Sequence, residues 1–183
     1  MPENAVRVLE LKSGAVHVID GVPPAELPSL AQDPRLQLHR ETGLNVGYLT
    51  FNLHHERYRD PEVRLAFALA LDRQELVRLA LDGAGTVAHY PLPPSFLGYP
   101  DKPDVIPHDA ARAKEILARH ADAFATPVRL HVMNAPRPFF ASPERAASVI
   151  RADLEAVGLK VEIVTRDFAT HLCEILTNPG AAE

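Results

Sequence analysis

The most regular hydrophobic pattern lies in the middle of the chain and predicts two consecutive helices. The first is expected to begin at Asp60-Pro61, because Asp60 can accept a hydrogen bond from a free backbone amide and Pro61 has no amide to leave unpaired. Asp72, with Glu75 three residues later, resembles a capping box and predicts a second helix that continues to Gly83. The apolar positions that recur at helical spacing in the first helix are Val63, Ala66, Phe67 and Ala70.

The last third of the chain predicts a strand, a helix and a second strand. Apolar residues alternate over 127–133 and again at Val161 and Ile163, which is typical of strands. Between them, Ser142-Pro143-Glu144 favours a helix start and Gly158 a helix end. Two strands joined by such a crossover lie parallel in one sheet, and about 98% of these crossovers are right-handed. A further helix is expected from Phe168 to Leu176.

The first 53 residues show shorter patterns. Helices are predicted over 4–13 and from Pro23 onward, where prolines occupy the first turn. Period-two alternation predicts strands over 15–20, 35–40 and 45–53. In the third strand, the face with Leu49 and Phe51 is the more apolar and is expected to face the core, whereas Tyr48 and Asn52 share the other face.

One long stretch, residues 84–108, has no periodic pattern. It contains six prolines, with Tyr90, Phe96 and Tyr99 between them. Irregular loops of this length are uncommon in compact domains and usually have a binding or packing task. Asp109 is expected to cap the helix that follows.

Composition narrows the class of protein. The formal net charge is −5 and the charges are interspersed, which argues against a nucleic-acid-binding face and against attraction to an anionic membrane. The single cysteine, Cys173, cannot form an intrachain disulfide and is expected to be a buried, inert thiol. The residues after Met1 lack the pattern of a signal peptide, so the chain as written is expected to stay in the cytoplasm.

Catalytic motifs are lacking in the sequence. There is no Gly-x-Ser-x-Gly elbow, no phosphate-binding glycine loop and no dinucleotide fingerprint. The sequence therefore favours a protein that is not an enzyme and that has no cofactor. His54-His55-Glu56 could ligate a metal, but adjacent residues at a strand end point in different directions, so we favour a loop and predict no metal site. A metal-dependent enzyme that uses these three residues is the alternative hypothesis.

Four stretches, in this order, resemble family 5 of the bacterial extracellular solute-binding proteins, the class that binds peptides and nickel. The most specific is Tyr48-Leu49-Thr50-Phe51-Asn52 followed by residues 60–73, which end in Asp72-Arg73. The others are Leu11–Asp20, with His17 where the family usually has aspartate, Pro93-Pro94 ahead of Gly98-Tyr99 and then Asp109–Leu117, and Ala152–Val161.

The resemblance implies an α/β fold of the type II periplasmic-binding-protein class, with a mixed sheet flanked by helices and a C-terminal βαβ unit. Two such lobes are joined by a hinge in this family, and the solute lies in the cleft between them. Residues 1–44 are then the tail of the first lobe. Residues 45–183 are most of the second, truncated before its end.

The implied function is solute binding, with a peptide as the expected cargo, for an ABC importer whose permease complex is the membrane partner. The full-length parent is expected in the periplasm or outside the cell, associated with the membrane. Two alternatives stay open: a ligand-sensing domain of a bacterial regulator, and a nickel- or metal-chelate-binding member of the same family. Unpaired sheet edges and exposed apolar surface also predict a homo-oligomer.

Four residues are predicted to bind the ligand. Asn134 follows a strand at its carboxyl end, where ligands bind in open α/β sheets, and its amide could pair with a peptide backbone. The alternative for Asn134 is a turn before Pro136. Arg137 is expected at the edge of the same cleft. Tyr48 and Asn52 either line the cleft or pack against a helix.

Overall fold

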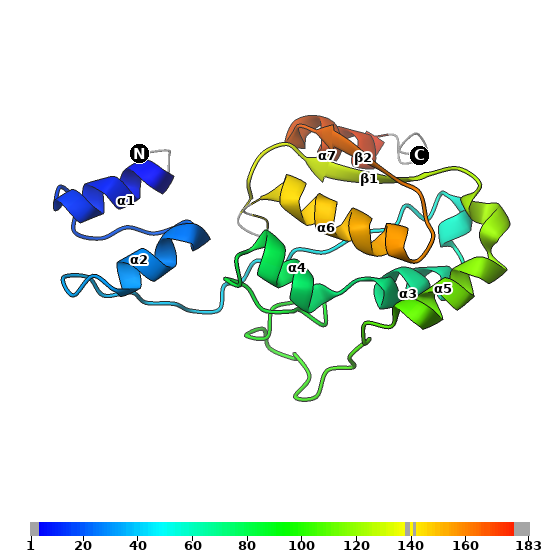
Figure 1. Ribbon diagram of the computed structural model, residues 1–183, viewed down its shortest axis with the longest axis horizontal. Helices are drawn as coiled ribbons and strands as arrows, with labels where there is room; N and C mark the ends of the chain where they lie inside the picture. Colours follow the sequence, from blue (N-terminus) through cyan, green and yellow to red (C-terminus); the bar gives the residue numbers. More distant parts are fainter. Residues whose placement is uncertain (1–3, 138–139, 141, 178–183) are drawn as a thin grey trace.

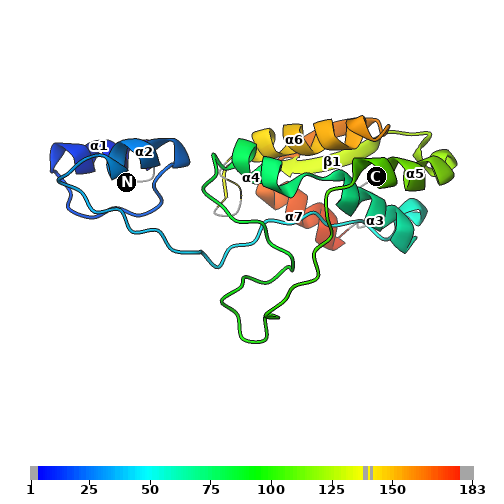
Figure 2. The ribbon, with the colours of Figure 1, turned by 60° about the horizontal axis from the view of Figure 1, so that its bottom comes forward.

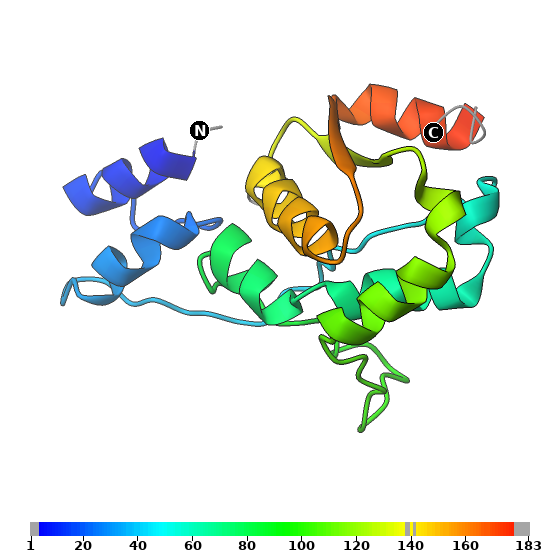
Figure 3. The same ribbon diagram turned by 45° about the vertical axis from the view of Figure 1, so that its right-hand side comes forward.

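The computed structural model describes residues 4–137, 140 and 142–177 (Figure 1). Two helices near the N-terminus lie apart from the remaining elements, and the chain between the two parts is extended (Figures 1 and 3). Arg7 pairs with Asp20 at 2.5 Å and Lys12 with Glu26 at 2.9 Å, so the small part is held together by its own ion pairs. Its elements are α1 (Asn4–Ser13), the 3-10 helix η1 (Pro24–Glu26) and α2 (Leu27–Ala31).

The larger part is a helical layer packed on a two-stranded sheet. Helix α3 packs against α5, and α4 packs against α6. Helices α6 and α7 lie on opposite sides of the sheet (Figures 1 and 3). The elements are η2 (Glu56–Tyr58), α3 (Pro61–Ala70), α4 (Arg73–Ala80), α5 (Ala110–Arg119), η3 (Ala121–Phe124), β1 (Val128–Met133), α6 (Pro143–Ala156), β2 (Val161–Arg166) and α7 (Phe168–Thr177).

The predicted βαβ unit is confirmed. Strands β1 and β2 are parallel and in register from Val128 opposite Val161 to Met133 opposite Arg166. Helix α6 connects them, and its chain reverses at Gly158, whose φ of +97° suits a residue without a side chain. Both strands therefore end at the same edge of the sheet.

The predicted helix starts are confirmed as well. The carboxylate of Asp60 accepts a hydrogen bond from the Glu62 amide at 2.8 Å, and Asp109 accepts one from the Arg112 amide at 2.9 Å. Helix α4 ends at Ala80 and does not reach Gly83, because the amide of Gly83 turns back to the carbonyl of Val77. The expected side-chain caps therefore mark where α3 and α5 begin.

One continuous core joins the helices to the sheet. Leu69, Leu154 and Val63 are the largest of its fully buried side chains. An aromatic cluster extends it, with the ring of Phe67 between 5.4 and 5.9 Å from the rings of its three neighbours. Those neighbours are Phe51, Tyr58 and Phe124.

Three strand predictions are wrong. Residues 15–20, 35–40 and 45–53 are extended or turning, and the described sheet contains only β1 and β2, so it is parallel and not mixed. A period-two pattern becomes a strand only where a neighbouring strand completes the hydrogen-bond ladder, and these segments have no such neighbour among the described residues. Val18 is accordingly 87% exposed.

Two surface features complete the description. Cys173 is exposed on α7, so the prediction of a buried thiol is wrong. In the part of the chain that the structure covers, every helix is too short or too polar to cross a membrane.

Residues 84–108 form the expected irregular loop and project away from the helices (Figure 2).

Candidate ligand-binding site at the carboxyl edge of the sheet

Asn134 lies where the sequence predicts, at the carboxyl edge of the sheet. It follows β1 directly, and its backbone amide donates to the carbonyl of Arg166, the last residue of β2, at 2.8 Å. This bond extends the ladder by one step, while the side chain of Asn134 is exposed. The side-chain amide of Asn134 can therefore face a ligand that lies beyond the carboxyl ends of both strands.

Arg137 lies in the loop after the same strand. Its backbone N–H and C=O each form a 2.9 Å hydrogen bond with Phe140, which makes a tight local pairing. Its guanidinium carbon lies 4.1 Å from the centre of the Phe168 ring, at the start of α7. The loop after β1 and the start of α7, which follows β2, therefore meet at the carboxyl edge of the sheet. This is expected because the two parallel strands end at the same edge.

The hydrogen-bonding capacity of Arg137 is not used up by the protein. Its Nε is buried and has no hydrogen-bond partner among the described residues. A guanidinium is planar, and its N–H groups lie in its own plane, where they can match the two oxygens of a carboxylate. The arrangement can therefore bind an anion.

Two helix starts contribute to the electrostatics of this edge. Helix α6 begins at Pro143 without a side-chain cap, so its first amides keep their partial positive charge. Helix α7 is capped by Asp167, whose carboxylate accepts a bond from the Thr170 amide at 3.0 Å. The hydroxyl of Thr170 also donates to Asp167, and these bonds lower the pKa of that carboxyl below its ordinary value.

Phe168 was missed by the sequence analysis. Its signal in the sequence is positional, because an aromatic residue comes directly after the second strand of a βαβ unit. Phe139, which the sequence places beside Phe140 in the loop, lies outside the described residues.

Tyr48 and Asn52 lie in the extended segment before η2 and not on a strand. The side-chain oxygen of Asn52 accepts a bond from the His54 amide at 3.1 Å, and its carbonyl accepts one from the His55 amide at 3.1 Å. Asn52 therefore shapes a turn. Tyr48 is 63% exposed, so its ring is available to a ligand or to another part of a larger protein.

The turn at His54-His55-Glu56 does not gather metal ligands. The ring of His55 packs against Tyr58, with the ring centres 6.2 Å apart. Among residues 4–137, 140 and 142–177, no three side chains of histidine, cysteine, aspartate or glutamate lie close enough to hold a metal ion. The hypothesis of a metal-dependent enzyme at this turn therefore finds no support in the geometry.

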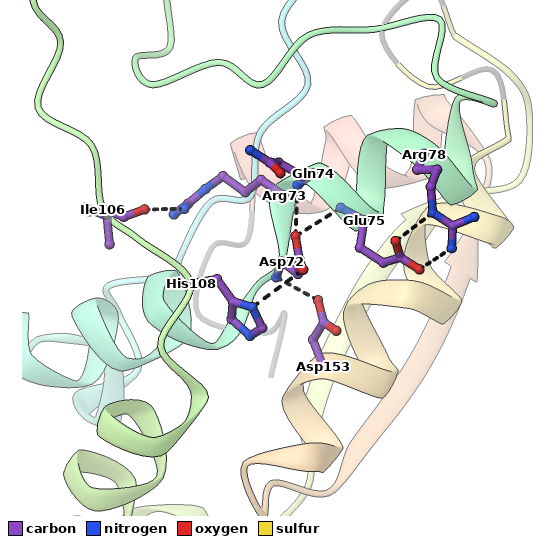
Figure 4. A network of polar contacts seen from close by, with 8 residues as sticks. All are labelled: Asp72, Arg73, Gln74, Glu75, Arg78, Ile106, His108 and Asp153. Atoms are coloured by element: carbon purple, nitrogen blue, oxygen red, sulfur yellow. Dashed lines mark hydrogen bonds and ion pairs between the residues drawn. The ribbon is translucent and has the colours of Figure 1, made fainter.

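The Asp72-Arg73 pair, part of the most specific sequence resemblance, lies in a different place (Figure 4). Asp72 caps α4 by accepting bonds of 3.0 Å from the amides of Gln74 and Glu75. Its own amide donates to the carboxylate of Asp153 on α6, also at 3.0 Å.

The same pair also holds the end of the long loop. Arg73 donates to the carbonyl of Ile106 at 2.9 Å and to that of Ala68 at 3.0 Å. His108 Nδ1 lies 3.5 Å from a carboxylate oxygen of Asp72. The motif therefore joins α3, α4, α6 and the loop 84–108, which is a structural task distinct from ligand binding.

Replacing Asp153 with asparagine is expected to change how stability depends on pH. Burial raises the pKa of the Asp153 carboxyl above its ordinary value of 3.8, although the Asp72 amide acts in the opposite direction. The folded state then binds a proton more readily than the unfolded state, so this group stabilises the fold as pH falls from 7 through the raised pKa. Relative to Asp153→Asn, the wild type should gain stability over that range in urea unfolding curves.

The control for this experiment is Glu155→Gln, which removes an exposed carboxylate from the same helix. Its stability difference from the wild type measures the effect of removing a carboxylate that is not buried, for comparison with Asp153→Asn. A wild type that loses stability relative to Asp153→Asn on acidification would contradict the raised pKa.

The fold belongs to the type II periplasmic-binding-protein class. Residues 1–178 match the family model described as bacterial extracellular solute-binding proteins, family 5 Middle. The chain belongs to this family.

Three similar proteins illustrate the relationship. Over 170 residues the chain is 30% identical to di/tripeptide-binding protein 1 of Pseudomonas aeruginosa, covering 93% of the chain and 32% of that protein. Over 174 residues it is 32% identical to heme-binding protein A of Haemophilus influenzae, covering 93% and 31%. The solved structure of HbpA2 from Haemophilus parasuis has a TM-score of 0.80 at 29% identity and is covered over 34% of its length, against 93% of this chain. The chain thus spans about a third of the length of the relatives it matches.

Proposed function

We propose that this chain is part of the substrate-binding subunit of an ABC importer and that it binds the carboxylate end of a peptide. One observation carries the proposal: the guanidinium of Arg137 lies over the Phe168 ring, its Nε has no partner among the described residues, and its loop follows Asn134 at the carboxyl edge of a parallel sheet. A peptide offers a carboxylate for the arginine and backbone amides for the asparagine. The name of the P. aeruginosa relative, a di/tripeptide-binding protein, supports this ligand class.

The mechanism we propose is closure of two lobes around the solute. Residues 1–44 would belong to one lobe and residues 45–183 to the other, with the extended chain between the two described parts as a hinge (Figure 1). In Figure 1 the carboxyl ends of β1 and β2 point toward the side on which α1 and α2 lie. Closure favours the bound state because the solute touches both lobes only when they are shut. No bond is made or broken in this scheme.

The proposed partners are a membrane permease complex and, for the chain alone, a second copy of itself. The parent protein would act in the periplasm, which the name of a relative in Escherichia coli, the probable ABC transporter periplasmic-binding protein SapA, supports. Self-association is supported by exposed apolar side chains such as Val18 and Leu97. Sedimentation velocity at rising concentration tests it, and a monomer throughout would contradict it.

A titration of the ¹⁵N-labelled chain tests the ligand-binding proposal. Alanyl-phenylalanine with a free carboxylate should shift the amide signals of Asn134, Arg137 and Phe168, with a dissociation constant on the order of millimolar, since one lobe makes only part of the contacts. The carboxy-amidated dipeptide should bind more weakly. Arg137→Gln should weaken binding of the free acid about tenfold or more, because a charge-assisted bond is lost.

The matched control is Arg145→Gln. Arg145 is an exposed arginine on α6 that pairs with Asp82 at 2.9 Å, so its loss changes the net charge equally but leaves the site intact. This variant should bind like the wild type. Equal shifts for the acid and the amide, or no shifts up to about 10 mM, would overturn the proposal.

A further inference from the structure

The stack between Arg137 and Phe168 fixes a side chain that would otherwise be mobile. An arginine side chain loses rotamer freedom when it is held in one conformation. Among the described residues, Arg137 forms no ion pair with a carboxylate, and its backbone pairs with that of Phe140. The ring 4.1 Å from the guanidinium carbon is therefore the contact that orients the charged end.

Phe168 is well placed for this task. It is the first residue of α7, and the cap that Asp167 provides fixes that helix start. Its ring is 43% exposed, so it is not needed to fill the core. The ring centre lies 4.1 Å from the guanidinium carbon of Arg137, in the loop that follows β1 at the carboxyl edge of the sheet.

We propose that Phe168 is a positioning residue for the ligand site: it holds the Arg137 guanidinium in the orientation that accepts a planar carboxylate. This inference rests on the proposed function for its ligand, but the stack itself exists without one. It assigns to Phe168 the preference of the site for a free carboxylate over a neutral chain end.

The first experiment needs no ligand. In the wild-type chain, the Arg137 Nε–H and Hδ signals should be shifted upfield by the ring, and the buried Nε–H should exchange slowly with water. Phe168→Leu should return these signals toward those of a mobile arginine. Phe168→Trp keeps an aromatic face and should retain the shift. The backbone amide spectrum reports whether each variant folds.

The second experiment uses the dipeptide pair. Phe168→Leu should weaken binding of the free acid about two- to fivefold, as expected for the loss of one partly exposed cation–π contact, and should leave binding of the amide unchanged. Phe168→Trp should restore the preference for the acid. In an Arg137→Gln background, Phe168→Leu should have no further effect, because the two residues act as one unit.

Two outcomes would overturn the inference. Arg137 signals that do not change in Phe168→Leu would show that the ring does not orient the guanidinium. Equal losses for acid and amide would show that Phe168 is only a wall of the site. A wild type that makes no distinction between acid and amide would instead reject the proposed function, and the ligand-free spectra would still decide the role of the stack.

Discussion

Replacing Leu154 with alanine is expected to lower the free energy of unfolding by about 3–5 kcal/mol. Leu154 lies on α6, is 2% exposed, and belongs to the core that also contains residues of α3, α5 and β1. Truncation removes buried methyl groups and leaves a cavity that the surrounding helices can close only in part. Urea unfolding at 25 °C, followed by circular dichroism, measures the change.

Leu97→Ala is the matched control for this substitution. Leu97 is 105% exposed in the loop 84–108, so the same chemical change should alter stability by no more than about 0.5 kcal/mol. If Leu154→Ala lowered the free energy of unfolding as little as Leu97→Ala does, α6 would not pack on the sheet as described.

Replacing Phe67 with alanine is expected to have a similar cost, about 3–5 kcal/mol, for a different reason. Its ring contacts those of Phe51 at 5.4 Å, Tyr58 at 5.9 Å and Phe124 at 5.9 Å. It therefore joins the segment before α3 to the 3-10 turn after α5. Besides the loss of stability, hydrogen exchange of amides in residues 51–58 should accelerate more than that of amides in β1.

Phe67→Leu separates ring geometry from volume. It keeps much of the buried apolar area and loses the edge-to-face contacts, which are worth about 0.5–1.5 kcal/mol. It should therefore cost less than the alanine variant. An alanine variant in which exchange rises uniformly over the whole larger part would contradict a local role for the cluster.

Much of the fold could be predicted because its signals are local. Asp60, Asp72 and Asp109 cap helices through bonds to amides two or three residues away, so their roles are visible in the sequence. The βαβ unit follows from two alternating segments with a helical pattern between them, because a parallel pair needs a crossover of this kind. These predictions required no knowledge of distant contacts.

The strands predicted before residue 54 failed for the opposite reason. Alternation at Val16, Val18 and Leu49 reports which positions suit a strand, but a strand also needs a ladder partner, which is a long-range property. The exposure of Cys173 is likewise set by what packs on α7 and not by the helix itself.

The candidate site was predictable in part. The position of Asn134 follows from the rule that strand ends share an edge, and Arg137 from its neighbouring loop. The contact of Arg137 with Phe168 depends on how α7 leaves the second strand, which no local pattern encodes. Tyr48 and Asn52 were assigned from a strand that does not form, and their binding role stays a prediction.

The position of the Asp72-Arg73 motif has an evolutionary consequence. The residues that mark this lineage in the sequence clamp three helices and a loop together (Figure 4), whereas the loop after β1 carries the groups that would meet a cargo. Mutations in that loop can accumulate without loosening the clamp. A protein divided in this way can change its ligand through mutations in the loop after β1. It would still be recognisable as a member of the same family.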